Sequence, residues 1–124
     1  MSYTDRYYRT WNGPFAFTQV EISKIPPRMM GVYQLLYPNE QEKLVAYIGI
    51  ATGATIKQRL SSHFNGRGNW AAARLARPED WEFIYYECSA TDARQIEAHV
   101  VSDDKPPFNV RPEYRHYIPS ISIH

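Results

Sequence analysis

Cysteine is nearly absent from this chain, since Cys88 is the only one among 124 residues. A single cysteine excludes an intrachain disulfide framework and is typical of a reducing compartment. Together with the four histidines, it does not reproduce zinc-finger spacing. Long apolar runs are also lacking: no stretch approaches a membrane span, and the first residues do not resemble a signal peptide. We therefore expect a cytoplasmic protein that has no membrane partner.

Excess charge of either sign is lacking too, because the formal net charge is +1. Overall charge therefore predicts neither a nucleic-acid partner nor an acidic one. Aromatic residues are plentiful, with ten Tyr, five Phe and three Trp. They allow one small domain with its own core. The sequence does not determine an oligomeric state.

The low net charge conceals a basic segment. Between Lys43 and Pro78 the chain has six Lys or Arg and no Asp or Glu, whereas acidic residues dominate over 79–104. A basic surface with an aromatic residue is typical of a phosphate-backbone contact, although a solvated helix pair has the same composition. The candidate contacts to a nucleic-acid backbone are Lys57, Arg67, Trp70, Arg74 and Arg77.

The stretch from Gly31 to Gly49 predicts a β-hairpin. Two apolar, β-rich runs flank residues 38–42, whose Pro-Asn-Glu-Gln-Glu sequence is typical of a turn. If residues 38–42 form the loop, Tyr33 lies directly opposite Tyr47, and Gly31 opposite Gly49. Opposite residues share a face, so the two phenols are expected side by side. A packing pair of aromatic residues is the simplest interpretation of this arrangement.

The segment 55–64 predicts a helix that begins at a threonine cap. Its apolar stripe has helical spacing and consists of Ile56, Leu60 and Phe64. Arg59 and His63 are also four residues apart, so they project together from a neighbouring stripe. Such a pair forms either a solvated flank or part of a site.

The segment 81–88 predicts a third strand that is apolar on both faces and therefore suits the centre of a sheet. Ser89 begins a last helix. Its buried stripe consists of Ala93, Ile96 and Val100. Glu97 lies at the rim of this stripe, where a carboxylate is either half-exposed without a role or directed into a site.

The chain ends are expected to be an N-terminal arm over 1–30 and a C-terminal tail over 110–124, around a domain at 31–109. Phe15 and Phe17 are candidates for an additional edge strand in the arm. A packing role for the arm is favoured over contact with substrate.

Two triplets, Gly31-Val32-Tyr33 and Tyr47-Ile48-Gly49, resemble the signature of the GIY-YIG nuclease superfamily, with Val in place of the first Ile. That superfamily carries an arginine, often followed by a histidine, on the helix after the second triplet. A metal-binding glutamate follows on a helix after the third strand, and then a proline and an asparagine. The positions in this chain that match are Arg59, His63, Glu97 and Asn109.

The resemblance covers about 31–109 and implies an α/β fold. The expected architecture is a small three-stranded antiparallel sheet flanked by helices, in the order β-β-α-α-β-α. The second of these helices is predicted near 70–76, where the sequence is strongly helix-forming.

The resemblance also implies a metal-dependent endonuclease that hydrolyses DNA phosphodiester bonds. Glu97 would bind one divalent ion, Mg²⁺ or Mn²⁺, and Arg59 would contact phosphate oxygens. Tyr33 would act as general base, and Arg59 and His63 are expected to lower the pKa of its phenol. The remaining assignments are orientation of the water or of Tyr33 by Tyr47, a proton relay or phosphate contact by His63, and a bracing role for Asn109.

Two alternatives stay open at this stage. One is a catalytically inactive nucleic-acid-binding module on the same fold. The other is a protein-interaction domain whose tyrosines only pack. The sequence does not distinguish DNA from RNA, and it indicates neither cleavage specificity nor pathway.

Overall fold

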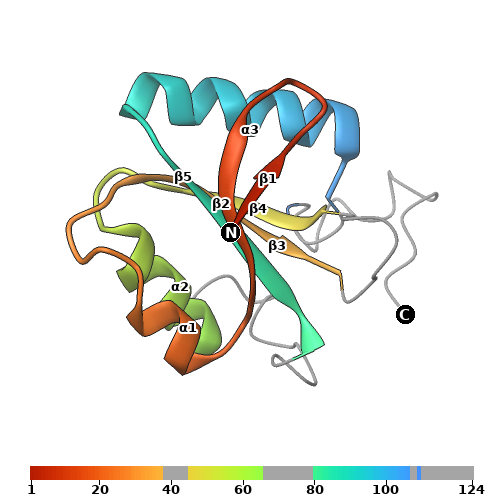
Figure 1. Cartoon of the computed structure of the whole chain (residues 1–124). Coiled ribbons are helices and arrows are strands. Elements are labelled where there is room, and N and C mark those ends of the chain that lie inside the picture. The colour runs from red at the N-terminus through yellow and green to blue at the C-terminus, as the bar shows by residue number, and fades with distance from the viewer. Residues whose placement is uncertain (38–44, 66–79, 107–108, 110–124) are drawn as a thin grey trace.

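The computed structural model describes residues 1–37, 45–65, 80–106 and 109. Their elements, in chain order, are β1 (Ser2–Thr4), β2 (Thr10–Ala16), α1 (Gln19–Ser23), β3 (Gly31–Leu36), β4 (Val45–Ala51), α2 (Ile56–Phe64), β5 (Glu82–Glu87) and α3 (Ala90–Asp104). The strands form one sheet in the order β1-β2-β5-β3-β4, and all neighbours are antiparallel. Helices α1 and α2 cover one face and α3 covers the other (Figure 1).

Alternation along the strands creates two cores, one on each face of the sheet. The core beneath α1 and α2 includes Phe17, Ile22, Tyr33, Leu35, Tyr47, Ile56, Leu60 and Phe83. The core beneath α3 includes Trp11, Val32, Leu36, Ile48, Ile84, Ala93, Ile96 and Val100. Strand β5 lies between β2 and β3 and contributes to both cores, which confirms its predicted central position.

The hairpin prediction is confirmed for its two strands, but the predicted register is wrong. Tyr33 lies opposite Gly49, and Tyr47 lies opposite Leu35, instead of the two tyrosines facing each other. The difference is two residues, so both tyrosines still share one face. Their rings are diagonal neighbours, with centroids 6.3 Å apart. The predicted loop at 38–42 lies outside the described residues.

Two local features accompany this register. A bulge occurs where Leu35 pairs with Tyr47 but Leu36 pairs with Val45, which inserts one additional residue into β4. Gly49 then provides space for the Tyr33 ring, because a Cβ at Gly49 would lie 2.4 Å from the Tyr33 hydroxyl oxygen. The Tyr33 ring therefore lies across Gly49. Any other residue at position 49 would displace the ring.

Both long helices begin as predicted. Thr55 accepts a hydrogen bond from the Gln58 amide and completes a capping box with it. Ser89 caps α3 through the Asp92 amide. No helix in the described part of the chain has the length and apolar character that a membrane crossing requires.

The predicted three-stranded sheet was too small, since the described residues form five strands. The two additional strands come from the predicted arm: β2 pairs with β5, and β1 pairs with β2. The strand predicted at Phe15 and Phe17 is present as the end of β2, which stops at Ala16. It is not an edge strand, because β1 pairs with the other side of β2. The earlier part of β2 was not predicted because Gly13 and Pro14 interrupt it, at the point where its register with β5 shifts. The short helix α1 was not predicted, and the predicted helix at 70–76 lies outside the described residues.

Gly31 provides a test of how tightly β3 and β5 approach. Its φ is +153°, and a Cβ there would lie 2.1 Å from the Tyr86 carbonyl oxygen. We expect Gly31→Ala to lower the free energy of unfolding by more than about 2 kcal/mol, because backbone must move to relieve the clash. Denaturant unfolding measures this effect. The matched control is Gly53→Ala, since a Cβ at Gly53 meets no atom within 4 Å; equal stability of the two variants would contradict the packing described here.

Candidate active site

A buried hydrogen bond joins the sheet to α2. The Tyr33 hydroxyl oxygen lies 2.7 Å from Nε2 of His63, and the two side chains are 0% and 2% exposed. Tyr33 comes from the middle of β3, and His63 from the last turn of α2. The alternative that His63 belongs to a solvated helix flank is therefore wrong, because the helix directs the ring into the core.

Burial determines the protonation of this pair. It lowers the pKa of His63 to about 4, and the charge of Arg59 acts in the same direction, so the imidazole is neutral at pH 7. Burial also raises the pKa of Tyr33 above the ordinary value of a phenol. Arg59 lowers the Tyr33 pKa as expected, but desolvation outweighs this effect. The predicted net lowering of the Tyr33 pKa was therefore wrong.

Tyr47 is influenced by charged groups from both helical layers. Its ring centroid is 5.2 Å from that of His63, and its side chain is 8% exposed. Burial raises the pKa of Tyr47, Arg59 opposes the shift, and the Glu97 carboxylate adds to it. Arg59 on α2 and Glu97 on α3 therefore both act on the Tyr47 phenol, although the helices cover opposite faces of the sheet.

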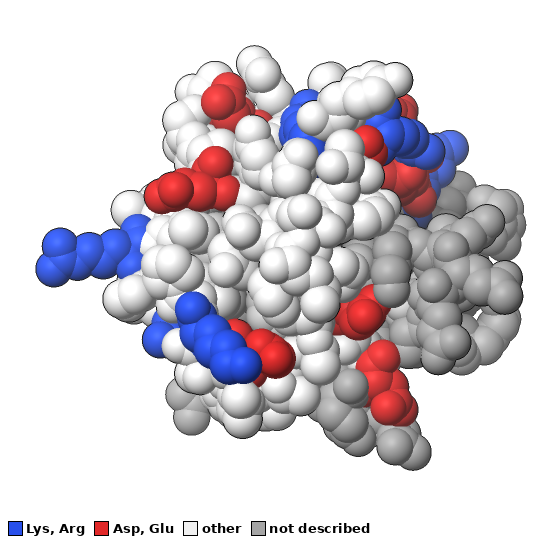
Figure 2. Space-filling view, in the orientation of Figure 1, with Lys and Arg blue, Asp and Glu red and all other residues white. Residues whose placement is uncertain are grey.

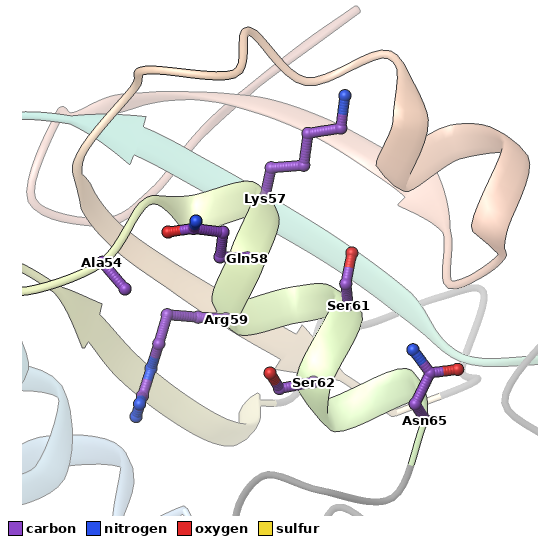
Figure 3. A pocket seen from close by; sticks show the side chains of 7 residues that line it. All are labelled: Ala54, Lys57, Gln58, Arg59, Ser61, Ser62 and Asn65. Carbon is purple, nitrogen blue, oxygen red and sulfur yellow. The ribbon is translucent and has the colours of Figure 1, made fainter.

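Arg59 is exposed and lines a hollow of about 640 Å³ on α2. Figure 3 shows Arg59 and Lys57 leaving opposite sides of the helix. The lining is polar apart from Ala54 and includes Gln58, Ser61, Ser62 and Asn65. Sequence analysis missed the two serines; the available signal was that Ser62 follows Arg59 by three residues and so shares its side of the helix.

Glu97 lies half-buried on α3, where burial raises the pKa of its carboxyl group. Within the described ranges, no cluster of three or more His, Cys, Asp or Glu side chains is positioned to hold a metal ion. Glu97 could supply one oxygen ligand, which suits a hard divalent cation that keeps several waters. This one carboxylate thus fits a single, water-rich divalent cation.

Asn109 closes the open edge of β4. Its side-chain amide donates to the Ile48 carbonyl and accepts from the Ile48 amide, each over 2.8 Å. Because β4 is the last strand of the sheet formed by the described residues, these two backbone groups have no described neighbouring strand on that side. The Asn109 amide replaces a strand partner beside Tyr47 and Gly49.

The candidate DNA contacts are mostly outside the described residues. Lys57 is described, and its ammonium group donates to the Ser23 carbonyl oxygen over 3.1 Å. Arg67, Trp70, Arg74 and Arg77 fall in the undescribed segment 66–79. On the face shown in Figure 2, the described Lys and Arg alternate with Asp and Glu and form no continuous basic patch.

The buried imidazole predicts a pH dependence of stability. An unfolded histidine titrates near pH 6.5, whereas folded His63 titrates near 4. Between these values the unfolded chain binds more protons, so the free energy of unfolding falls as the pH drops from about 7 to 4, by at most about 3 kcal/mol from this group. His63→Gln should flatten this dependence in urea unfolding measured at several pH values; parallel curves for wild type and variant would refute it.

Comparison with known proteins identifies the family. A model of the GIY-YIG catalytic domain matches residues 29–109. Three solved structures match, all of the N-terminal GIY-YIG endonuclease domain of UvrC from Thermotoga maritima bound to its catalytic divalent cation. Two carry a tyrosine-to-phenylalanine substitution and the third an asparagine-to-alanine substitution.

Each of these structures is 26% identical to this chain, with a TM-score of 0.52, and covers 76% of this chain and 100% of the UvrC domain. A search of curated proteins found no match. Since the family model spans well over half of the sequence, the chain belongs to the GIY-YIG catalytic domain family.

Proposed function

We propose that this protein is a metal-dependent endonuclease that hydrolyses DNA phosphodiester bonds. Family membership implies a nucleic-acid substrate. The observation that carries the proposal is the buried Tyr33–His63 hydrogen bond, which lies where the charges of Arg59 and Glu97 act on the neighbouring Tyr47 phenol. These are the groups that phosphodiester hydrolysis requires: a proton acceptor, a cation for phosphate and a ligand for a divalent ion.

Proton transfer through the pair avoids a free phenolate. Ionising a phenol of ordinary pKa at pH 7 costs about 4 kcal/mol, and burial makes this cost larger at Tyr33. Protonating His63, with its pKa of about 4, also costs about 4 kcal/mol at pH 7. The relay is therefore the less costly route, and an incoming anionic phosphate lowers the cost of the imidazolium further.

In this relay Tyr33 receives the proton of the attacking water while its own hydroxyl proton passes to Nε2 of His63. The water oxygen forms a bond to phosphorus, and the bond from phosphorus to the leaving oxygen breaks. The leaving oxygen keeps the electron pair of that bond and takes a proton from solvent. His63 ends the step as imidazolium and then releases the proton to solvent. Tyr33 thus remains the general base, with His63 as the final acceptor.

Arg59 and Glu97 would supply the two charged contacts of the reacting phosphate, one directly and one through the divalent ion. The exposed guanidinium of Arg59 offers a planar set of donors to phosphate oxygens. Glu97 would hold the divalent ion, which supplies Lewis-acid stabilisation of the negative charge that develops during hydrolysis. Tyr47, between these two charges, orients the water or Tyr33, and Asn109 keeps β4 in place beside it.

Binding of the nucleic-acid backbone is assigned to Lys57 together with Arg67, Trp70, Arg74 and Arg77. This assignment is supported by the absence of acidic residues between Lys43 and Pro78. Nonspecific phosphate contacts of this kind weaken as salt concentration rises. DNA binding should accordingly be strong at low ionic strength and weaken as salt is added.

Substitution of the proposed metal ligand separates binding from cleavage. Glu97→Gln keeps the shape of the side chain and removes its charge, so DNA binding should persist or strengthen. Plasmid cleavage in Mg²⁺ should fall at least about 10²-fold, which is typical for loss of one electrostatic element. Arg59→Ala should lose most cleavage and part of the binding. Glu87→Gln is the control, since Glu87 is an exposed glutamate on β5.

The outcomes distinguish the three candidate functions. Wild-type cleavage that continues in chelator, or full activity of Glu97→Gln, would contradict the one-metal assignment. A wild-type protein that binds DNA but does not cleave it, whichever divalent ion is added, would be an inactive nucleic-acid-binding module. A protein that neither binds nor cuts DNA would fit a protein-interaction domain.

A further inference from the structure

The turn between β1 and β2 is built around one carboxylate. Asp5 accepts hydrogen bonds from the backbone amides of Tyr7 and Arg9, over 2.8 and 2.9 Å, and from the indole nitrogen of Trp11, over 2.9 Å. Tyr8, between the two bonded amides, adopts a positive φ of 66°. Trp11 is fully buried in the core beneath α3. The turn is thus anchored to the same core as that helix.

Two side chains of this turn contact the end of α3. The Arg6 guanidinium forms an ion pair with the Asp104 carboxylate, and the Tyr7 hydroxyl donates to the Asp103 carboxylate. The Tyr7 ring also lies beside His99, with centroids 6.0 Å apart. In Figure 2 acidic and basic groups lie side by side over the β1–β2 turn and the end of α3.

These contacts compensate for two acidic residues whose charges destabilise the end of α3. Carboxylates at a helix C-terminus are repelled by the carbonyl end of the dipole. No basic residue occupies the last turn of α3 to offset Asp103 and Asp104. The compensating cation and hydroxyl come instead from Arg6 and Tyr7, so the end of α3 depends on the N-terminal turn.

We propose that the β1–β2 turn holds α3 in register with the site, and that Arg6 and Tyr7 are positioning residues for Glu97. Glu97 precedes Asp104 by seven residues, or about two helical turns. From Asp104 the chain continues to Asn109, which binds the edge strand at Ile48. The chain after Glu97 is therefore anchored at two points, by the turn at Asp103 and Asp104 and by β4 at Asn109.

The positioning residues lie outside the part of the chain that the family model covers. That model begins at residue 29, whereas the β1–β2 turn precedes β2, which ends at Ala16. The inference rests on the proposed function only in assigning Glu97 a role in metal binding. The contact between the turn and α3 can be tested without metal or DNA.

The test combines Arg6→Ala with Tyr7→Phe, because a single exposed ion pair contributes little. The control, Lys24→Ala, breaks the pair of Lys24 and Glu21, whose side chains are 65% and 28% exposed, close to the 59% and 27% of Arg6 and Asp104. The Lys24 pair belongs to α1 and does not touch α3.

Amide hydrogen exchange is measured first, on metal-free protein. Residues 97–104 should exchange about tenfold faster in the double variant, with α2 unchanged.

The second readout reports on Glu97. The concentration of Mg²⁺ that gives half-maximal cleavage should rise several-fold in the double variant, while DNA affinity and the rate at saturating Mg²⁺ change by less than about twofold. Mn²⁺ broadening of amide signals near Glu97 should weaken in parallel, and it requires no cleavage. A second variant exchanges the charges of the ion pair, Arg6→Asp with Asp104→Arg, and retains Tyr7. Its hydrogen exchange and its Mg²⁺ dependence should both match those of the wild-type protein.

Unchanged exchange over 97–104 would overturn the proposed contact, as would an equal effect of Lys24→Ala. Faster exchange with unchanged Mg²⁺ dependence and unchanged Mn²⁺ broadening would overturn the positioning role. If the wild-type protein never cleaves, the proposed function fails on its own, and exchange together with Mn²⁺ broadening still decides this inference.

Discussion

The candidate site depends on one close approach, that of the Tyr33 ring to the backbone of Gly49. The ring lies where a side chain at position 49 would be, so its hydroxyl can pass across β4 and meet His63 on α2. This approach therefore links three features: the register of the central hairpin, the packing of α2 and the position of the phenol. A shift in any of them would break the buried hydrogen bond, which is costly in a dry interior.

Burial, rather than nearby charge, determines the acid–base character of this site. A cation beside a phenol favours phenolate, and Arg59 acts in that direction. However, both Tyr33 and His63 are almost fully enclosed, and desolvation disfavours the charged form of each. The same enclosure keeps the imidazole neutral and therefore able to accept a proton. The pair is better suited to passing a proton than to holding a charge.

The position of the site at the sheet edge allows two helical layers to contribute to it. β4 is the outermost strand among the described residues, and charges on both α2 and α3 act on Tyr47, although the helices lie on opposite faces. An exposed edge is ordinarily a liability, because its backbone groups invite pairing with other chains. Here Asn109 satisfies the Ile48 backbone, and the same contact fixes the chain that follows α3.

The sequence by itself determined the local elements of this protein: the two triplets on paired strands, the capped helix with Arg59 and His63, the central third strand and the helix with Glu97. These follow from periodicity, capping and turn chemistry, which act over a few residues. The hairpin register, the burial of His63, the sign of the Tyr33 pKa shift and the strands contributed by residues 2–16 were decided only by tertiary structure. Each depends on a partner distant in the chain: Gly49 for the Tyr33 ring, the core for the His63 imidazole, and β5 for β2. Local propensity cannot encode a desolvation energy or a strand partner more than sixty residues away, because both arise only when the chain is packed.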